Sequence, residues 1–529
     1  MTSVLPTDLT EQALEATLDE IRAAVGAEHV LTDADDLREF RDPYWFAGWD
    51  DYEASAVVQP ASVEELQAIV RVANDHGVPL WVSSQGRNNG YGGSSPRVRG
   101  AVVVNLRRMN RVLEIDGDAA YAVVEPGVSF FELYEAVRGS GHKLWISVPD
   151  LGWGSVIGNA LEYGVGYTPY GEHANNVCGL EVLLPSGDLV RTGAGAISNG
   201  RAWHVYKRSF GPSFDGLFFQ SNLGIVTRMG VWLMPEPECY LPGWVMVSRD
   251  DDLGAMVDTL RELMLGGSIT GYPMILSPVA AASVFTDRAH WYDGEGVLPE
   301  EAIDRISSEL GFGRWTMRFA IHGDEAIVDH RFAKVQEAFG RIDGATVIGT
   351  KYAGADVHTI ENPAERVQAG VPNLELVQMG KWYGGEAGGH IGFSPAAPLT
   401  SSDAMRLRDL LRPALAEHGL DYSAALIPTG PRSFINVVLV VFDTSDEEQT
   451  RAAFDVSKEL VPKAAELGYG EYRAHIDFMD LCAQAYDFND YAGRRLAETI
   501  KDALDPNGIL MPGKQGIWPK RMRDAESPG

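Results

Sequence analysis

Cysteine is scarce in this chain, which has 529 residues and only Cys178, Cys239 and Cys482. No CxxC pair occurs, and no Cys/His spacing suits a zinc site. Three scattered cysteines exclude a disulfide framework and favour a reducing compartment. The absence of CxxCH also excludes a covalent c-type haem carried by this chain itself.

Basic residues are also few, since 44 Lys and Arg face 74 Asp and Glu, a formal net charge of −30. Such a surface repels phosphate backbones and anionic lipid, so no nucleic-acid or membrane partner is expected. The longest apolar runs, such as Val437–Phe442, have the length of a strand and are too short to span a bilayer. The stretch Met1–Glu20 is acidic and lacks the features of a signal peptide, which predicts a cytoplasmic protein.

Several common catalytic signatures are missing. The chain contains no GxSxG, no Walker loop, no HExxH and no dinucleotide-type GxGxxG at a strand–helix junction. A nicotinamide cofactor is therefore disfavoured, and no metal site is expected. The composition, with 45% hydrophobic and 22% charged residues, is that of a globular protein with two to four folding units.

Strands and helices alternate in the N-terminal half. A capping box at Ser62 and Glu65 begins a helix that ends at Gly77 and leads into a strand over Val78–Ser84. A second capping box, at Ser129 and Glu132, follows a strand over Tyr121–Val124. Further strands are predicted at Ala101–Leu106, Leu180–Leu184 and Ile225–Leu233.

The pattern changes near Pro235–Pro242. Two similar units follow, with strands at Gly243–Ser248 and Val437–Phe442 and helices at Met256–Leu265 and Ala452–Leu467; Ser445 and Glu448 form a third capping box. This pattern predicts an antiparallel sheet covered on one face by helices. The closing segment Asp505–Lys514 reads as an ordered, turn-rich loop.

Glycine is dense in two stretches, 86–93 and 152–171. Asn, Tyr, Trp and Pro are interleaved with the glycines, which is unlike a flexible linker. Glycine lets the backbone approach a ligand closely, and the N–H groups of such a loop can surround a pyrophosphate. The loop Gln85–Gly93 is therefore a candidate anion site.

Six segments in one order resemble the vanillyl-alcohol oxidase family of FAD-dependent enzymes. They are SSQGRNNGYGG (83–93), PDLGWGSVIGNALEYGVGYTPYGEH (149–173), SNLGIVTRMG (221–230), GGHIGFSP (388–395), GYGEYR (468–473) and PNGILMPGK (506–514). The resemblance is strongest to the bacterial eugenol oxidase and 4-alkylphenol oxidase branch. It implies an α+β, two-domain FAD-binding fold, with residues 1–239 and 469–529 binding FAD and an antiparallel-sheet cap domain over 240–468.

The resemblance also implies which residues bind FAD. Those expected to contact the cofactor are Gln85, Gly86, Arg87, Asn88, Asn89, Gly90, Gly92, Gly93, Leu151, Gly152, Ser155, Gly158, Asn159, Gly224, Ile225, Val226 and Lys514, the last beside Pro512 and Gly513. Glu172 and His173 match a family motif as well, and we expect His173 to be a buried, hydrogen-bonding residue.

His390 matches the histidine that some family members join covalently to the 8α-methyl carbon of the flavin. The glycine pair 388–389 lets the backbone pass close to the ring, and neutral imidazole is a good nucleophile toward an activated methyl group. The N-terminal glycine loop contains no histidine that offers a second anchor. An FAD that binds without a covalent link stays an alternative.

Four further residues match catalytic positions of the family. Tyr91, Tyr472 and Arg473 correspond to a trio that binds the substrate as phenolate, and Asp150 to an acidic residue near flavin N5, with Tyr167 as a wall of the pocket. Two hydroxyls and a guanidinium around a phenol oxygen stabilise its ionised form. Phenolate then pushes electrons to the para position, so that hydride can leave the benzylic carbon.

The implied function is oxidation of para-substituted phenols through a quinone methide, with O2 reduced to H2O2 by a homodimer or larger homo-oligomer. Three alternatives stay open. One is a dehydrogenase of the same fold that passes electrons to a cytochrome, and another is a flavin-dependent hydroxy-acid dehydrogenase. The third is a non-catalytic protein in which FAD is structural. The segments 271–284 and 424–433 do not show which phenol is preferred.

Overall fold

A four-stranded sheet begins the fold in the computed structural model, which describes residues 4–6, 9–44 and 50–523. Its strands lie in the order β1 (Val30–Leu31), β2 (Ala56–Val58), β4 (Val102–Asn105) and β3 (Leu80–Ser83), the last three parallel. Helix α3 (Val63–His76) joins β2 to β3. Ser62 caps it by accepting the Glu65 N–H, but the Glu65 carboxylate accepts the N–H of Ala61 rather than that of Ser62, so the predicted box is only half formed.

A five-stranded antiparallel sheet packs next to it. The order is β5 (Val112–Asp116), β6 (Tyr121–Val124), β10 (Ile225–Trp232), β8 (Val177–Leu183) and β9 (Leu189–Arg191). Helix α4 (Phe130–Gly139) follows β6, and both hydrogen bonds of the capping box at Ser129 and Glu132 are present. The short helix α5 (Val156–Leu161) lies beside it, so the predicted strand–helix alternation of this half is confirmed.

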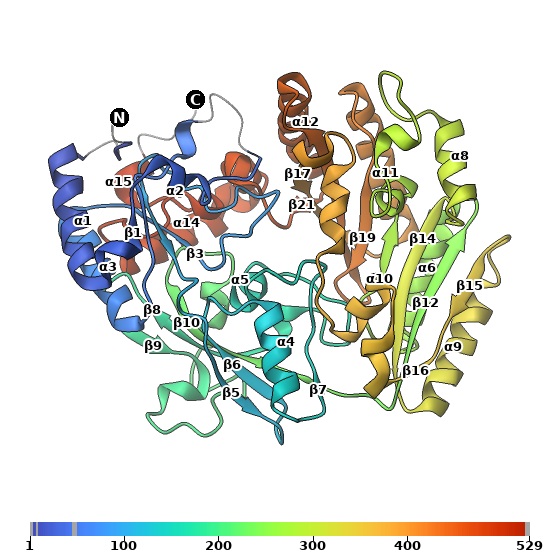
Figure 1. The fold of residues 1–529 in the computed structure, drawn as a ribbon, viewed down its shortest axis with the longest axis horizontal. Coiled ribbons are helices and arrows are strands. Elements are labelled where there is room, and N and C mark those ends of the chain that lie inside the picture. The colour runs from blue at the N-terminus through green and yellow to red at the C-terminus, as the bar shows by residue number, and fades with distance from the viewer. Residues whose placement is uncertain (1–3, 7–8, 45–49, 524–529) are drawn as a thin grey trace.

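A ten-stranded antiparallel sheet forms the other half of the molecule (Figure 1). Its main path is β15 (Thr346–Gly349), β12 (Cys239–Val247), β14 (Trp315–Gly323), β13 (Met274–Leu276), β19 (Ala424–Pro428), β20 (Ser433–Asp443), β18 (Pro395–Pro398) and β21 (Gly470–Glu471), with β16 (Tyr352–Ala353) on β12 and β17 (Gly388–Phe393) on β20. The sheet therefore begins at Cys239 and ends at Glu471, while the domain boundaries at 239/240 and 468/469 stay a prediction.

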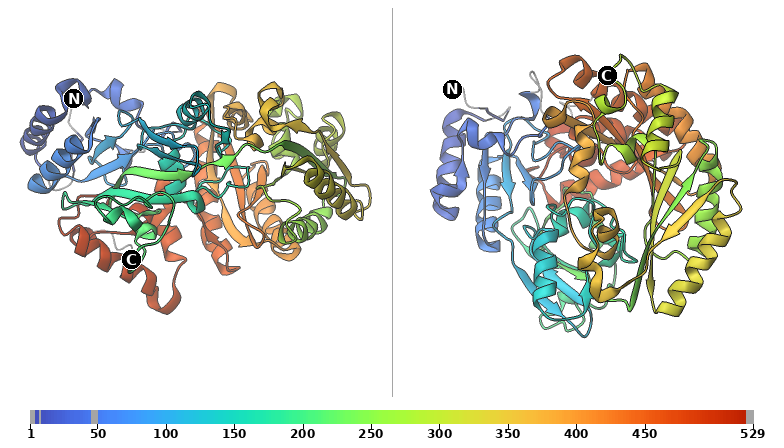
Figure 2. Two further views of the ribbon diagram at one scale, coloured as in Figure 1. Left: turned by 90° about the horizontal axis from the view of Figure 1, so that it is seen from below. Right: turned by 45° about the vertical axis from the view of Figure 1, so that its right-hand side comes forward.

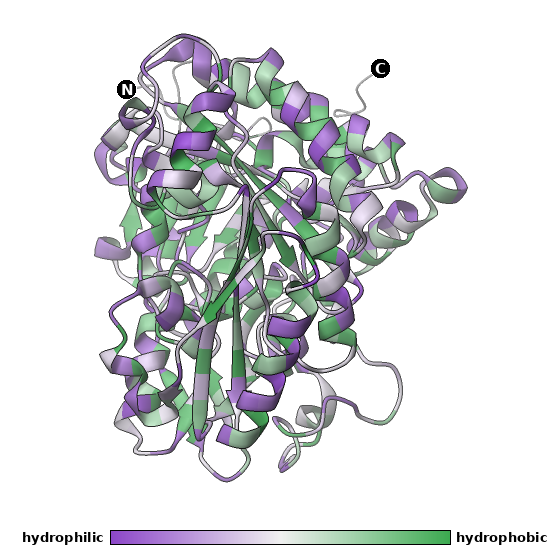
Figure 3. Cartoon of the chain, turned by 90° about the vertical axis from the view of Figure 1, so that its right-hand side faces the viewer, coloured by the Kyte–Doolittle hydropathy of each residue, from purple (hydrophilic) through white to green (hydrophobic). Residues whose placement is uncertain are grey.

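Long helices cover one face of this sheet, as expected. They are α6 (Asp252–Leu265), α9 (Glu325–Phe339), α11 (Ser401–Glu417) and α12 (Glu447–Glu466). Met317 and Phe319 of β14 share a core with α6 and α9, whereas Arg318 between them points to the opposite face, toward the first half. Figure 3 shows the central strands in green, the colour of hydrophobic residues, with purple concentrated on the outer helices and loops.

The third predicted capping box is wrong. Helix α12 begins at Glu447, and its N-cap is Asp446, whose carboxylate accepts the N–H groups of Glu448 and Gln449. Ser445 instead donates its hydroxyl to Asp443. Both Ser445 and Asp446 are residue types that can cap a helix. Because the Asp446 carboxylate accepts two backbone N–H groups, the helix begins at Glu447, five residues before the predicted start at Ala452.

The C-terminal segment returns to the first half, where the N-terminal and C-terminal colours lie together in Figure 2. After α14 (Phe488–Leu504), Leu80 donates its N–H to Ile509 and accepts that of Met511, at 2.7 and 2.8 Å, so 505–514 is ordered as predicted. The other elements of the described residues include α1 (Glu11–Val25), α2 (Ala34–Arg38), α7 (Pro278–Ala282), α8 (Glu300–Glu309), α10 (Pro363–Arg366), α13 (Met479–Gln484), α15 (Lys520–Arg523), β7 (Leu144–Trp145) and β11 (Met234–Pro235). No helix in the described ranges combines the length and the apolar character needed to cross a bilayer.

Candidate active site

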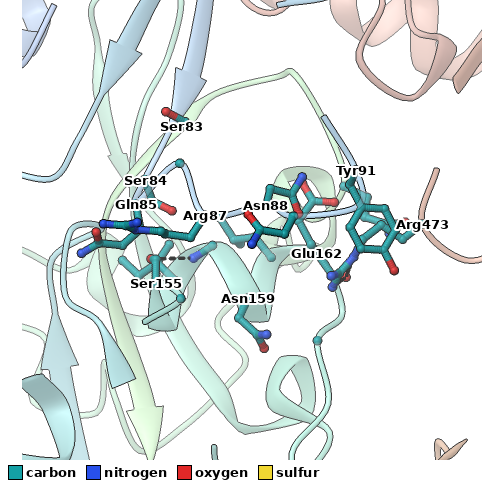
Figure 4. Close-up of a pocket in the computed structure, with 18 of the residues that line it drawn as sticks. Ser83, Ser84, Gln85, Arg87, Asn88, Tyr91, Ser155, Asn159, Glu162 and Arg473 are labelled. Atoms are coloured by element: carbon teal, nitrogen blue, oxygen red, sulfur yellow. Dashed lines mark hydrogen bonds between the residues drawn. The ribbon is translucent and has the colours of Figure 1, made fainter. Parts of the chain in front are cut away.

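A cavity of about 430 Å³ lies where the glycine loop, α5, β10, the large sheet and the C-terminal segment meet. Most of the predicted site residues line it, namely Gln85, Gly86, Arg87, Asn88, Asn89, Tyr91, Gly93, Asp150, Leu151, Ser155, Gly158, Asn159, Tyr167, Gly224, Ile225, Val226, His390, Tyr472, Arg473 and Lys514. Figure 4 shows the glycine loop running along one side of this cavity toward Tyr91 and Arg473.

Three predicted cofactor residues, Gly90, Gly92 and Gly152, lie behind the lining. A Cβ at Gly92 would meet the Ile476 side chain at 2.7 Å, and one at Gly152 would meet Pro372 at 2.6 Å. These two glycines are therefore required by packing against protein neighbours. Sequence alone does not separate a glycine that faces a ligand from one that faces the core.

The cavity suits a ligand that is rich in hydrogen-bonding groups and passes close to backbone. Ser221 lines the cavity, and its buried hydroxyl has no hydrogen-bond partner among the residues that the structure describes. A Cβ at Gly158 would lie 2.5 Å from the Ser84 hydroxyl, so the start of α5 sits tightly against the loop after β3. Ser155 caps α5 by accepting the Gly158 N–H, and it donates its hydroxyl to the Pro126 carbonyl. These features fit a large cofactor such as FAD.

Tyr91, Tyr472 and Arg473 come together on the cavity wall. The Arg473 guanidinium carbon lies 5.2 Å from the ring centre of Tyr91 and 5.1 Å from that of Tyr472. Burial, together with the nearby Tyr472, raises the pKa of Tyr91, although Arg473 opposes that shift. Burial alone would lower the pKa of Arg473, but the two tyrosines raise it, so the guanidinium stays charged.

A fourth group, Glu162, lies next to this trio and escaped the sequence analysis. Its backbone carbonyl accepts a hydrogen bond from Arg473 Nε at 3.1 Å, and its carboxylate pairs with Lys514 Nζ at 2.6 Å. The end of α5 thus joins the phenol trio to the C-terminal segment. No sequence motif distinguishes Glu162 from an ordinary surface glutamate.

Asp150 and Tyr167 form a second cluster with an unpredicted residue, Arg318. Arg318 Nη2 donates to Asp150 Oδ1 at 2.6 Å, and the Tyr167 hydroxyl donates to Oδ2. The guanidinium carbon lies 4.1 Å from the centre of the Tyr167 ring. Burial and the Asp150 charge raise the pKa of Tyr167 well above its ordinary value, so its hydroxyl remains a donor.

His390 lies on β17 and faces the cavity from the large sheet. Its Nδ1 is 3.1 Å from the hydroxyl of Tyr44, and burial lowers the pKa of the imidazole to about 4, so the ring is neutral. A Cβ at Gly90 would lie 2.8 Å from Nε2, which explains the glycine at that position. Tyr44 was not foreseen, because it is 346 residues distant in the chain.

His173 has the buried, hydrogen-bonded position expected of it. Its ring nitrogens contact Asn159 Oδ1 at 2.6 Å and the Ser147 hydroxyl at 3.1 Å, and burial lowers its pKa to about 3. The ring therefore orients Asn159 from behind the cavity. Glu172 accepts a hydrogen bond from Asn175 and does not line the cavity.

The large sheet adds an apolar wall, formed by Ile427 of β19 with Ile435 and Val437 of β20. This wall includes part of the segment 424–433, whose role the sequence left open.

Within the described residues, no group of three or more His, Cys, Asp and Glu is arranged to hold a metal ion, and all three cysteines are buried free thiols.

Comparisons with known proteins identify the fold. Residues 54–193 match the family model described as an FAD binding domain, and residues 436–515 match that of the C-terminal domain of FAD linked oxidases. A solved 4-ethylphenol oxidase from Gulosibacter chungangensis is 39% identical, with a TM-score of 0.93 over 98% of this chain and all of that one. A solved p-cresol methylhydroxylase is 33% identical, with a TM-score of 0.91 over 98% and 99%.

Among curated proteins, the flavoprotein subunit of 4-cresol dehydrogenase (hydroxylating) from Pseudomonas putida is 34% identical over 97% of this chain and 98% of its own. A 1'-carboxy-chondrochloren decarboxylase from Chondromyces crocatus is 28% identical over 97% and 99%. Similarity of this extent covers both halves and every segment of the cavity. The chain therefore belongs to the vanillyl-alcohol oxidase family of FAD-linked oxidoreductases, with FAD as its cofactor.

Proposed function

We propose that this protein oxidises para-substituted phenols at the benzylic carbon. The observation that carries the proposal is the convergence of Tyr91, Tyr472 and Arg473 on one wall of the FAD cavity. The similarity to a 4-ethylphenol oxidase and a p-cresol methylhydroxylase over nearly the whole chain supports it. A hydroxy-acid substrate would call for more cations around a carboxylate than this wall offers.

The trio suits a phenolate better than a neutral phenol. A phenol ionises near pH 10 in water, and a neighbouring guanidinium favours the ionised form. The raised pKa of Tyr91 keeps its hydroxyl protonated, so that it donates to the ligand oxygen instead of repelling it. The negative charge then spreads through the ring to the para carbon, and this weakens the benzylic C–H bond toward loss of hydride.

When bound, FAD supplies the acceptor of two electrons that takes up this hydride. We propose that His390 anchors the cofactor covalently through Nε2. The rest of it is held by the Gln85–Gly93 loop, the start of α5, residues 224–226 where β10 begins, and Lys514. If Nδ1 donates its proton to the Tyr44 hydroxyl oxygen, the lone pair of Nε2 is free for bond formation.

Asp150 is proposed to act on the oxidised substrate, a quinone methide. As a water oxygen bonds to the benzylic carbon, one O–H bond breaks and its proton passes to the Asp150 carboxylate. The electron pair displaced from the quinone methide returns to the ring oxygen, which becomes phenolate again. Loss of a proton from the neighbouring carbon gives an alkene instead, and an alcohol substrate gives an aldehyde.

We propose O2 as the final electron acceptor, with a cytochrome as the second candidate because one relative is the flavoprotein subunit of a 4-cresol dehydrogenase. The test is to mix the purified yellow protein with 4-ethylphenol without air and record the flavin spectrum. Bleaching at 450 nm, followed by recovery and peroxide formation when air is admitted, is expected. Bleaching without peroxide would favour the cytochrome, and no bleaching with any para-alkylphenol would refute phenol oxidation.

A further inference from the structure

Arg318 is a deeply buried charged group next to the cavity, and the proposed chemistry leaves it without a role. It lies near the middle of β14, where it pairs in register with Trp244 of β12 and Met274 of β13. Its side chain is 3% exposed, and its Nε is buried without a hydrogen-bond partner in the described part of the chain. A cation in such surroundings costs several kcal/mol unless a counter-charge is close.

Its counter-charge is Asp150, at 2.6 Å. Asp150 is 15% exposed and lines the cavity, whereas Arg318 does not line it. Both carboxylate oxygens are held, one by Arg318 and the other by Tyr167. The guanidinium therefore lies directly behind a carboxylate that faces the reacting region.

We propose that Arg318 is a positioning residue for the oxidation, which holds the Asp150 carboxylate in one orientation on the cavity wall. The inference rests on the proposed phenol oxidation. Departure of hydride leaves the benzylic carbon poor in electrons, and a fixed negative charge on the wall stabilises that state without having to reorganise. A carboxylate that is protonated or free to rotate loses this effect.

Few other titratable groups face this pair. Tyr167 donates to the carboxylate, and Tyr240 of β12 is close enough to Arg318 to interact with its charge. His322 lies two residues further along β14, contacts the Gln368 carbonyl at 3.1 Å, and is neutral because burial lowers its pKa to about 4. Arg318 is thus the cation that pairs with Asp150 in this cluster.

The test compares flavin-loaded Arg318→Gln and Arg318→Lys with the unchanged protein. The rate constant of anaerobic flavin bleaching by 4-ethylphenol is recorded from pH 5 to 9, and binding of 4-tert-butylphenol, which has no benzylic hydrogen, is titrated by the flavin spectrum. Arg318→Gln is expected to slow bleaching at least tenfold at each pH. Binding should change less than twofold, and Arg318→Lys should recover part of the rate.

Arg288 offers a matched control away from the cavity. It is also an arginine with little exposed surface, since its side chain is 11% exposed; it pairs with Asp421 at 3.0 Å and lies 5.2 Å from the Tyr292 ring centre. Arg288→Gln should lower the melting temperature and leave the bleaching rate and the pH profile unchanged. Asp150→Asn combined with Arg318→Gln should be no slower than Asp150→Asn alone, because the carboxylate that Arg318 positions is already absent from Asp150→Asn.

Equal bleaching rates and equal pH profiles in Arg318→Gln and Arg288→Gln would overturn the proposal. It would also be overturned if Arg318→Gln slowed bleaching by the same factor in the Asp150→Asn background as in the unchanged protein. If Arg318→Gln does not fold, Arg318→Lys decides, because a bleaching rate equal to that of the unchanged protein would count against the role. Failure of the unchanged protein to bleach with any phenol refutes the proposed function itself, and this role with it. The two failures are therefore distinguished by the first measurement.

Discussion

Gly90 lies against His390, and replacing it with alanine tests how closely the anchor must be placed. Gly90 has φ +79°, and an added Cβ would lie 2.8 Å from both Cδ2 and Nε2 of His390. The left-handed backbone costs an alanine about 1–2 kcal/mol. Carbon contacts are favourable near about 3.5 Å, so the imidazole must move by roughly 0.7 Å.

A displacement of that size at a bond-forming atom slows the reaction strongly, since about 1 Å of misplacement can cost about 100-fold. Gly90→Ala is therefore expected to bind FAD and to attach it covalently at least tenfold more slowly. The assay adds FAD to flavin-free protein, stops samples with acid at intervals, and measures flavin fluorescence of the chain on a denaturing gel.

Gly187→Ala is the matched control, because Gly187 has φ +89° and nothing lies within 4 Å of an added Cβ. It carries the same backbone cost without a contact to the ring. If Gly90→Ala acquires acid-stable flavin as fast as Gly187→Ala, the reasoning about His390 is wrong.

Four further changes test separate parts of the site. Tyr91→Phe should weaken binding of 4-tert-butylphenol about tenfold, seen in flavin difference spectra, because one donor to the phenolate oxygen is lost. Tyr44→Phe should slow covalent attachment about tenfold while FAD still binds, followed by gel fluorescence. The fully buried Asp505 lies 2.7 Å from Lys501 Nζ. Lys501→Met removes this cation and should lower the free energy of unfolding in urea by about 3–5 kcal/mol. Burial raises the pKa of Glu471 to about 8, so its neutral form favours the folded state. That stability is complete below the unfolded pKa near 4.5 and is lost as pH rises through about 8. Glu471→Gln should flatten this loss, on the order of 4 kcal/mol, in melting curves from pH 5 to 9.

Local signals explain which parts of the fold were predictable. Helices α3 and α4 follow from caps and periodic apolar residues that lie within one stretch of chain. The start of α12 was misplaced because Ser445 and Asp446 are both good caps, and only the hydrogen bonds of the folded chain choose between them. The cofactor loop could be predicted from the sequence because its glycines and asparagines lie in one short stretch of chain.

The residues that the sequence analysis missed are brought in by tertiary structure. Arg318 lies 168 residues from Asp150, and it is surrounded by the ordinary apolar alternation of a buried strand. Tyr44 reaches His390 from the N-terminal segment, and the apolar wall at Ile427 depends on the register of β19 on β20. None of these has a local pattern, because the pairing of distant strands determines each contact.

The central claim is that the substrate oxygen is ionised between Tyr91, Tyr472 and Arg473. The direct measurement is the ultraviolet difference spectrum of 4-tert-butylphenol bound to the flavin-loaded protein at pH 7, beside that of Arg473→Gln. The account predicts a phenolate band with the unchanged protein and its loss in the variant. A ligand that binds equally well to both and stays a neutral phenol up to about pH 10 would contradict it.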